Sequence, residues 1–202
     1  MLFCKNVRRF GAENEISTGM VDVAIKSTDG HPLVYLPHHD YYSDAHLRDI
    51  LTKVRCFAMV GASATWKRPS FYAMKYLLKK GYRVVPINPR SAGEEILGQK
   101  VYGSLADYSG ELDMVDVFRS SEDAFDITKD VIANMAEKNI KVLWMQLTVR
   151  NDKAADLAEA AGLTVIMNRC PKIEFARLSG ELGWSGINTK IVTAKVLRPP
   201  RI

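Results

Sequence analysis

Short, mostly apolar runs alternate along this chain with longer segments in which apolar residues recur at helical spacing. The five runs cover residues 56–60, 83–87, 114–118, 141–145 and 163–167. Runs of this kind are typical of strands that are covered on both faces. Because strands that alternate with helices form right-handed βαβ units, the pattern predicts a parallel sheet with helices on its faces.

Residues that favour helix ends stand between the predicted strands. The last predicted helix runs from Pro171 to about Leu178, and residues 91–112 are interpreted as mostly loop. Caps, first-turn prolines and terminal glycines have well-defined positional preferences, so these residues predict the other helix ends. The signals are Ser43 or Asp44, Pro69, Gly81, a capping box of Ser120 with Asp123, Asn151 and Gly162.

We therefore predict an α/β protein with a Rossmann-like parallel sheet flanked by helices, built as a single domain over residues 41–182. Residues 1–40 are an N-terminal extension, and residues 183–202 are a short C-terminal tail. Within the extension, apolar residues at 21–25 and 33–36 with a turn signal between them predict a small hairpin. The tail holds one apolar run, at 191–196.

Composition is that of an ordinary globular protein, with 47% hydrophobic and 25% charged residues in 202. No apolar run approaches the ~20 residues that a membrane span needs. Three scattered cysteines do not make a disulfide framework, which favours a reducing compartment. The net charge of +5 is a mild excess and is weak evidence for nucleic acid, which usually requires a clustered basic face. We expect no nucleic-acid partner, and the charge fits a small anionic ligand equally well.

The N-terminus carries a weak targeting signal. Its first ten residues are basic and free of acids, as in a mitochondrial presequence, but Glu13 and Glu15 follow and serine is sparse. We interpret residues 1–40 as an ordinary extension and expect a cytoplasmic protein, with a mitochondrial location left open.

The predicted strand ends select the residues that could form a ligand site. In sheets of this kind ligands bind beyond the carboxyl ends of the strands. The residues at those ends are Gly61–Ser63, Asn88–Arg90, Arg119, Gln146 and Asn168–Cys170.

The turn Gly61-Ala62-Ser63 joins the first strand to a helix start and has small side chains that let a ligand approach the backbone. A strand, a tight turn and a helix N-terminus present backbone N–H groups to an anion. Lys67, Arg68 and Ser70 stand at the same helix start, so we interpret the turn as a phosphate site, although the standard Gly-x-Gly-x-x-Gly fingerprint is absent. The alternative is a tight turn with a structural role alone.

The second strand ends in Asn88, Pro89 and Arg90, with no acid to hold the 2′-hydroxyl of an NAD ribose. An arginine there suits a phosphorylated ribose, since a guanidinium can hold phosphate with two parallel hydrogen bonds. This favours NADP or coenzyme A. Two alternatives stay open: Arg90 could be a solvated loop residue, and Glu94 or Glu95 could still face a ribose.

The remaining strand ends give weaker hypotheses. Arg119, after Phe118, could meet phosphate or stack on an adenine, or it could be a surface arginine near a cap. Gln146 could hydrogen-bond an amide of the ligand, or it could be a satisfied polar residue at the sheet end.

Cys170 is a candidate thiol nucleophile because Arg169, Lys172 and a helix start adjoin it. A cysteine nucleophile usually needs a base, however, and residues 47–202 contain no histidine. The alternative is a buried structural thiol. We find no Ser–His–Asp order, no acid/base carboxylate pair and no cluster that would hold a metal.

With these strand ends in view, the chain resembles the CoA-binding protein family, relatives of the N-terminal domain of the succinyl-CoA synthetase alpha subunit. The resemblance covers about residues 45–182, and its motifs are Val60–Ser63, Arg68–Ser70, Gly81–Pro89, Glu95–Gly98, Val115–Arg119, Leu143–Gln146, Ala161–Val165 and Asn168–Cys170. It implies coenzyme A across the strand ends, with phosphates near Gly61, Ser63, Arg68 and Arg90 and the adenosine around Asn88 and Phe118–Arg119.

The resemblance does not extend to the chemistry of the synthetase. That chemistry uses a phosphorylated histidine in a further domain, and this chain has neither the domain nor a histidine in its predicted sheet. We therefore expect a protein that binds coenzyme A or an acyl-CoA, more as a non-catalytic or regulatory protein than as an enzyme. In one variant, Cys170 forms a mixed disulfide with coenzyme A.

Two other classes of function remain alternatives. An NADP-dependent oxidoreductase would share the turn and Arg90 but lacks an evident proton donor. A nucleotide-sensing regulatory protein would contact a partner, or a second copy of itself, through its termini.

Overall fold

The computed structural model describes residues 39–180. All helices and strands described below belong to the unit of the chain that begins at Tyr42. The hairpin predicted at 21–36 and the apolar run at 191–196 lie outside the described residues.

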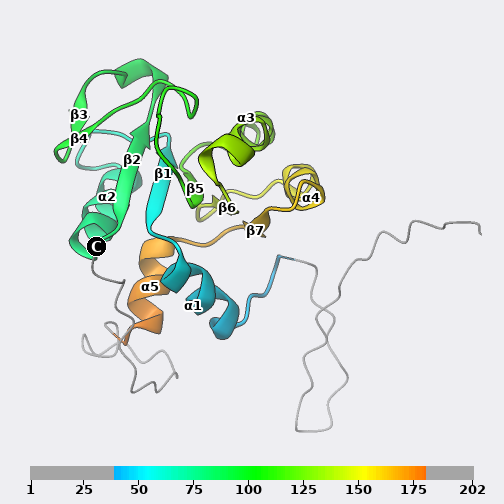
Figure 1. Ribbon diagram of the computed structural model, residues 1–202. Coiled ribbons are helices and arrows are strands. Elements are labelled where there is room, and N and C mark those ends of the chain that lie inside the picture. The colour runs from blue at the N-terminus through cyan, green and yellow to red at the C-terminus, as the bar shows by residue number, and fades with distance from the viewer. Residues whose placement is uncertain (1–38, 181–202) are drawn as a thin grey trace, which may run out of the picture. The chain divides into compact units, whose positions relative to one another are not determined.

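Five parallel strands form the central sheet, in the order β2-β1-β5-β6-β7 (Figure 1). The strands are β1 (Cys56–Val60), β2 (Arg83–Ile87), β5 (Met114–Val117), β6 (Val142–Met145) and β7 (Thr164–Ile166). The chain first runs outward from β1 to β2, then returns across β1 to β5 and continues to β6 and β7. The strand order therefore reverses between β1 and β5, and a crevice at such a reversal is where sheets of this kind bind ligands.

Helices cover both faces of this sheet, which confirms the predicted α/β, Rossmann-like fold (Figure 1). Strand residues alternate between the two layers: Phe57 and Met59 pack on one face, and Cys56 and Ala58 on the other. This alternation explains why β1 is apolar throughout. The first face is covered by α1 (Asp44–Lys53), α2 (Pro69–Lys79) and α5 (Pro171–Leu178), and the second by α3 (Asp123–Lys138) and α4 (Asp152–Ala160).

The helices begin where the sequence predicts. Ser43 accepts a hydrogen bond from the backbone N–H of His46 through its Oγ (3.2 Å), and Asn151 caps α4 by accepting from the N–H of Ala154 (3.0 Å). Ser120 accepts from the N–H of Asp123 (3.1 Å), the first residue of α3. Each such bond satisfies a backbone donor that the first helical turn leaves open.

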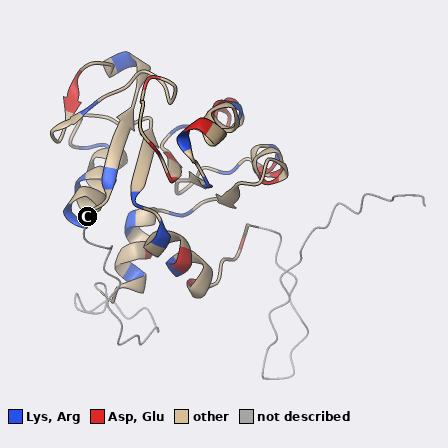
Figure 2. Ribbon diagram, in the orientation of Figure 1, with Lys and Arg blue, Asp and Glu red and all other residues tan. Residues whose placement is uncertain are grey.

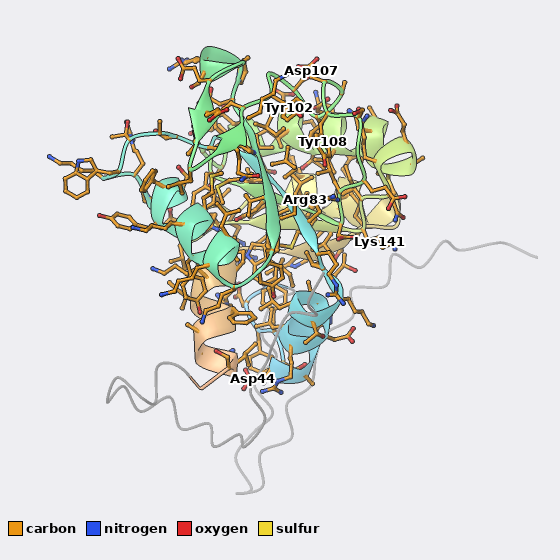
Figure 3. The ribbon with its side chains drawn as sticks, turned by 60° about the vertical axis from the view of Figure 1, so that its left-hand side comes forward. Asp44, Arg83, Tyr102, Asp107, Tyr108 and Lys141 are labelled. Atoms are coloured by element: carbon orange, nitrogen blue, oxygen red, sulfur yellow. The ribbon has the colours of Figure 1, made fainter. Side chains whose placement is uncertain are left out.

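Residues 91–112 are mostly loop, as predicted, but they contain a short hairpin that the sequence did not indicate. Strands β3 (Glu95–Ile96) and β4 (Gln99–Lys100) pair antiparallel, and the following Tyr102 bridges to Ile87 at the end of β2. The turn between β3 and β4 needs two residues at positive φ, which are Leu97 (51°) and Gly98 (75°). Tyr102 and Tyr108 then meet edge to face, with ring centroids 5.2 Å apart (Figure 3).

An ion pair joins the first and last described helices. The guanidinium of Arg177 on α5 lies 2.7 Å from Asp44 at the start of α1, and Asp44 is labelled in Figure 3. The same guanidinium binds Glu174 at 2.7 Å, so two carboxylates hold one cation. Burial of Glu174 and partial burial of Arg177 reduce the screening that weakens exposed pairs.

Charged residues of both signs occur along α1 and α3, as the colouring of Figure 2 shows. Within residues 39–180, no helix combines the length and the apolar character that a membrane crossing would require.

Candidate functional site

The candidate site lies at the carboxyl edge of the sheet, where β1 and β5 are neighbours. Two hollows open there, and Arg119 lines both of them. We call the larger, of about 650 Å³, the large cleft, and the smaller, of about 250 Å³, the side pocket.

Gly61 occupies the point where the turn after β1 meets the chain after β5. Its φ of +86° is unfavourable for any residue with a side chain, and a Cβ atom there would lie only 2.4 Å from the carbonyl oxygen of Phe118. The N–H of Gly61 donates to Ile87 (2.9 Å), and the N–H of Phe118 donates to Val60 (2.8 Å). The close backbone neighbour that requires a glycine at position 61 is therefore Phe118 of the protein itself.

Asn88 fixes the same turn through its side chain. Its amide nitrogen donates to the carbonyl of Ala62 (2.8 Å), and its amide oxygen accepts from the N–H of Arg90 (3.0 Å). The asparagine thus ties the end of β2 to the turn after β1. This positioning role was missed from the sequence, which suggested a ligand contact alone.

The N-terminus of α2 is favourable for an anion. Among the five α-helices of residues 39–180, only α2 has no acidic residue in its first turn. Its N-cap residue, Arg68, makes no side-chain capping bond, and Lys67 precedes it. Helix N-termini carry a partial positive charge, which these two cations reinforce.

The large cleft lies beside this helix start. It brings together four of the predicted site residues: Phe118, Arg119, Gln146 and Cys170. Lys67 and Lys172 line it as well, and no carboxylate does. The remaining lining residues, which the sequence did not predict as site residues, are Pro69, Tyr72, Ala73, Leu147, Thr148, Val149 and Ile173.

The side pocket brings together Gly61 and the end of the second strand, Asn88–Arg90. Two carboxylates that sequence reasoning missed, Asp123 and Asp126, also line it from the first turn of α3. Hydrogen bonds from Ser120 and then the charge of Arg119, 3.2 Å away, hold the pKa of Asp123 below its usual range. The capping box at 120–123 was the sequence signal that could have indicated Asp123, since it places an acid at the helix start that follows β5.

Four predicted site residues line neither hollow: Ala62, Ser63, Arg68 and Ser70. Ala62 and Ser70 are buried, and the Oγ of Ser63 accepts from the N–H of Thr65 (3.2 Å). These three residues shape the turn and the helix start, and their contact with a ligand remains a prediction.

A buried carboxyl group supports the floor of the large cleft. Asp116, in the middle of β5, is fully buried, and burial raises its pKa to about 8. The side-chain amide of Gln146 donates to both of its oxygens, at 2.9 and 3.1 Å. Asp116 is therefore mostly protonated at neutral pH, and it fixes the orientation of the one amide side chain that lines the cleft.

Cys170 lies on the same floor, at the N-cap of α5, and is almost fully buried. Burial raises the pKa of its thiol, and the nearby Asp116 adds to this. Backbone N–H groups of Ile173 and Lys172 and the amide of Gln146 oppose the shift without cancelling it. The thiol is therefore protonated at neutral pH, which disfavours its use as a ready nucleophile.

The segment before Cys170 is held in place by the strand beside it. The indole nitrogen of Trp144, a fully buried residue of β6, donates to the carbonyl of Arg169 (2.7 Å). The side-chain amide oxygen of Asn168 accepts a hydrogen bond from the backbone N–H of Thr148 (2.9 Å). These bonds tie the loop after β7 to β6 and to the loop that follows β6. Across residues 39–180, no group of three metal-binding side chains comes together.

Comparison with known proteins gives consistent results. Residues 55–176 match the family described as the CoA binding domain. An uncharacterized protein of Bacillus subtilis, YneT, is 33% identical over 134 residues, which are 66% of this chain and 95% of that protein. A solved structure of a hypothetical protein from Pyrococcus horikoshii is 35% identical, has a TM-score of 0.65, and is matched over 72% of this chain and 97% of its own.

A ligase shares part of the match. The ADP-forming acetate–CoA ligase II of Archaeoglobus fulgidus is 31% identical over 102 residues, which are 50% of this chain but only 14% of the ligase. The shared part is thus one domain of a much larger enzyme. The family match covers all five strands of the sheet and both hollows at its carboxyl edge. The chain belongs to the CoA-binding domain family.

Proposed function

We propose that this protein binds coenzyme A across the carboxyl edge of its sheet, in a non-catalytic or regulatory role. The observation that carries the proposal is the acid-free, cation-flanked N-terminus of α2, which stands beside the large cleft in a chain of the CoA-binding domain family. Such a helix start suits the negatively charged pyrophosphate of the ligand.

The two hollows suit the two arms of coenzyme A. The pyrophosphate lies at the start of α2, near Lys67 and Arg68, and the adenosine enters the side pocket. The pantetheine arm extends into the large cleft, where Gln146 can hydrogen-bond an amide. Arg119 lines both hollows and so stands where the two arms meet.

Arg90 is the residue proposed for the 3′-phosphate of the ribose. It lines the side pocket together with Asp123 and Asp126, which would repel a phosphate if no cation were present. Removal of the Arg90 guanidinium would leave Arg119, which is already paired with Asp123, as the one cation offsetting two carboxylates that face the ligand's negative charge.

Isothermal titration with coenzyme A, dephospho-coenzyme A and NADPH tests this proposal. We expect coenzyme A to bind more tightly than dephospho-coenzyme A, which lacks the 3′-phosphate, and Arg90→Ala to remove that difference. The matched control is Arg48→Ala, since Arg48 is a half-buried arginine of α1 that lines neither hollow. Tight binding of NADPH with no signal from coenzyme A would favour an oxidoreductase instead.

A further inference from the structure

Exposed apolar side chains gather at the large cleft. Residues 39–180 contain six exposed large apolar side chains, and three of them line this cleft: Tyr72 (46% exposed), Leu147 (46%) and Ile173 (41%). They come from three separate elements, namely α2, the loop after β6, and α5. Scattered exposed apolar residues are ordinary, but a group around one concavity marks a binding surface.

The rest of the cleft wall continues this apolar surface. Ala73, Phe118 and Val149 also line it. The polar lining consists of Gln146 and Cys170 on the floor, the hydroxyl of Thr148 and three cationic side chains, which are the partners available to the proposed pantetheine arm and pyrophosphate. The pantetheine arm has its own amide and hydroxyl groups, so an apolar wall of this extent is not needed to hold it.

The proposed orientation of coenzyme A places its thiol end in the large cleft. With the adenosine in the side pocket and the pyrophosphate at the start of α2, the thiol end points into the large cleft, toward Cys170. Whatever group the thiol carries therefore meets Tyr72, Leu147 and Ile173. The cleft holds about 650 Å³ and has room for more than a short arm.

We propose that the ligand is an acyl-CoA whose acyl group is uncharged and apolar, and that Tyr72, Leu147 and Ile173 bind this acyl group. The inference rests on the proposed function, because it needs coenzyme A to lie in the stated direction. It adds a class of substrate, a hydrocarbon thioester, that the coenzyme alone does not specify.

Titration with a series of thioesters tests the inference. Coenzyme A and its acetyl, butanoyl and hexanoyl thioesters should bind with increasing affinity, by roughly fourfold for each methylene that the cleft buries. Succinyl-CoA, of similar length to the butanoyl thioester but with a terminal carboxylate, should bind more weakly than butanoyl-CoA because its carboxylate loses water against an apolar wall.

Two variants separate the acyl contact from binding of the coenzyme. Ile173→Asn should reduce the gain in affinity from coenzyme A to hexanoyl-CoA severalfold, which is more than any change it makes in the affinity for coenzyme A itself. Leu97→Asn is the control, since Leu97 is also an exposed apolar residue (37%) but lies in the β3–β4 turn and lines neither hollow. Circular dichroism of each variant verifies that it is folded.

The outcomes distinguish the two proposals. If coenzyme A binds and all thioesters bind equally, the acyl inference is wrong and the proposed function stands. Tighter binding of succinyl-CoA than of butanoyl-CoA would also overturn it, in favour of a carboxylate held by Lys172. Absence of any binding by coenzyme A would overturn the proposed function and the inference together.

Discussion

Substitution of Gly61 by alanine tests how the turn after β1 is built. The new Cβ atom would lie 2.4 Å from the carbonyl oxygen of Phe118 and 3.0 Å from its carbonyl carbon. Both are backbone atoms held by the bond from Phe118 to Val60, so they cannot move aside cheaply. Steric overlap in a packed site costs about 1–3 kcal/mol, and the positive φ costs a side chain about 1–2 kcal/mol. We expect a loss of roughly 2–5 kcal/mol in the free energy of unfolding.

Gly93→Ala is the matched control. Gly93 has nearly the same φ, +89°, but a Cβ atom there has no heavy atom within 4 Å. Both substitutions also restrict the unfolded chain equally, so their difference isolates the contact with Phe118. Urea unfolding followed by circular dichroism should show Gly61→Ala to be less stable than Gly93→Ala by about 1–3 kcal/mol. Equal losses in the two variants would refute the close-approach argument.

Three further predictions concern other parts of the site. Burial raises the pKa of Asp116 to about 8 from an ordinary 3.8, so the folded state holds this proton and the stability that the group contributes falls as pH rises from about 4 to about 8. In urea unfolding at a series of pH values, Asp116→Asn should flatten that fall. Parallel pH profiles for the two proteins would contradict this reasoning. Asn88→Ala should destabilise the fold by about 1–3 kcal/mol and weaken coenzyme A binding, because the turn loses the hydrogen bond from Asn88 to the carbonyl of Ala62. An unchanged affinity for coenzyme A would count against a positioning role for Asn88. Cys170 should react with coenzyme A disulfide slowly at pH 7 and faster toward pH 9, because its thiolate attacks the disulfide and releases one coenzyme A thiolate. Mass spectrometry of the protein–coenzyme A adduct can follow this reaction. An equally fast reaction at pH 7 would mean that the thiol is already ionised.

The main elements were predictable because local signals and burial agree. Apolar runs located all five strands to within a residue or two, and Ser43, Asn151 and the prolines located the helix starts. These residues act through bonds within three or four positions of themselves, which a single sequence displays. The β3–β4 hairpin was missed because its turn uses Leu97-Gly98, and leucine rarely adopts a positive φ.

The site was predictable only in part, because its walls depend on how distant elements pack. The strand-end rule selected Arg119, Gln146 and Cys170, which do line one cleft. It gave no indication of Asp116, which stands inside an apolar run and is recognisable only by its complete burial. Leu147 and Ile173 carry no local signal, and they meet only because β6 and β7 are neighbours in the sheet.

The position of coenzyme A can be measured directly through the backbone amides of the protein. In ¹H–¹⁵N correlation spectra of the full chain, added coenzyme A should shift the amides of Ser70 and Phe71 at the start of α2 and of Thr148 in the large cleft. Amides at the opposite edge, at Asp113 and Lys141, provide the internal control, and Lys141 is labelled in Figure 3. Shifts confined to the carboxyl edge are the predicted result; shifts at the amino edge alone, or none at saturating ligand, would contradict it.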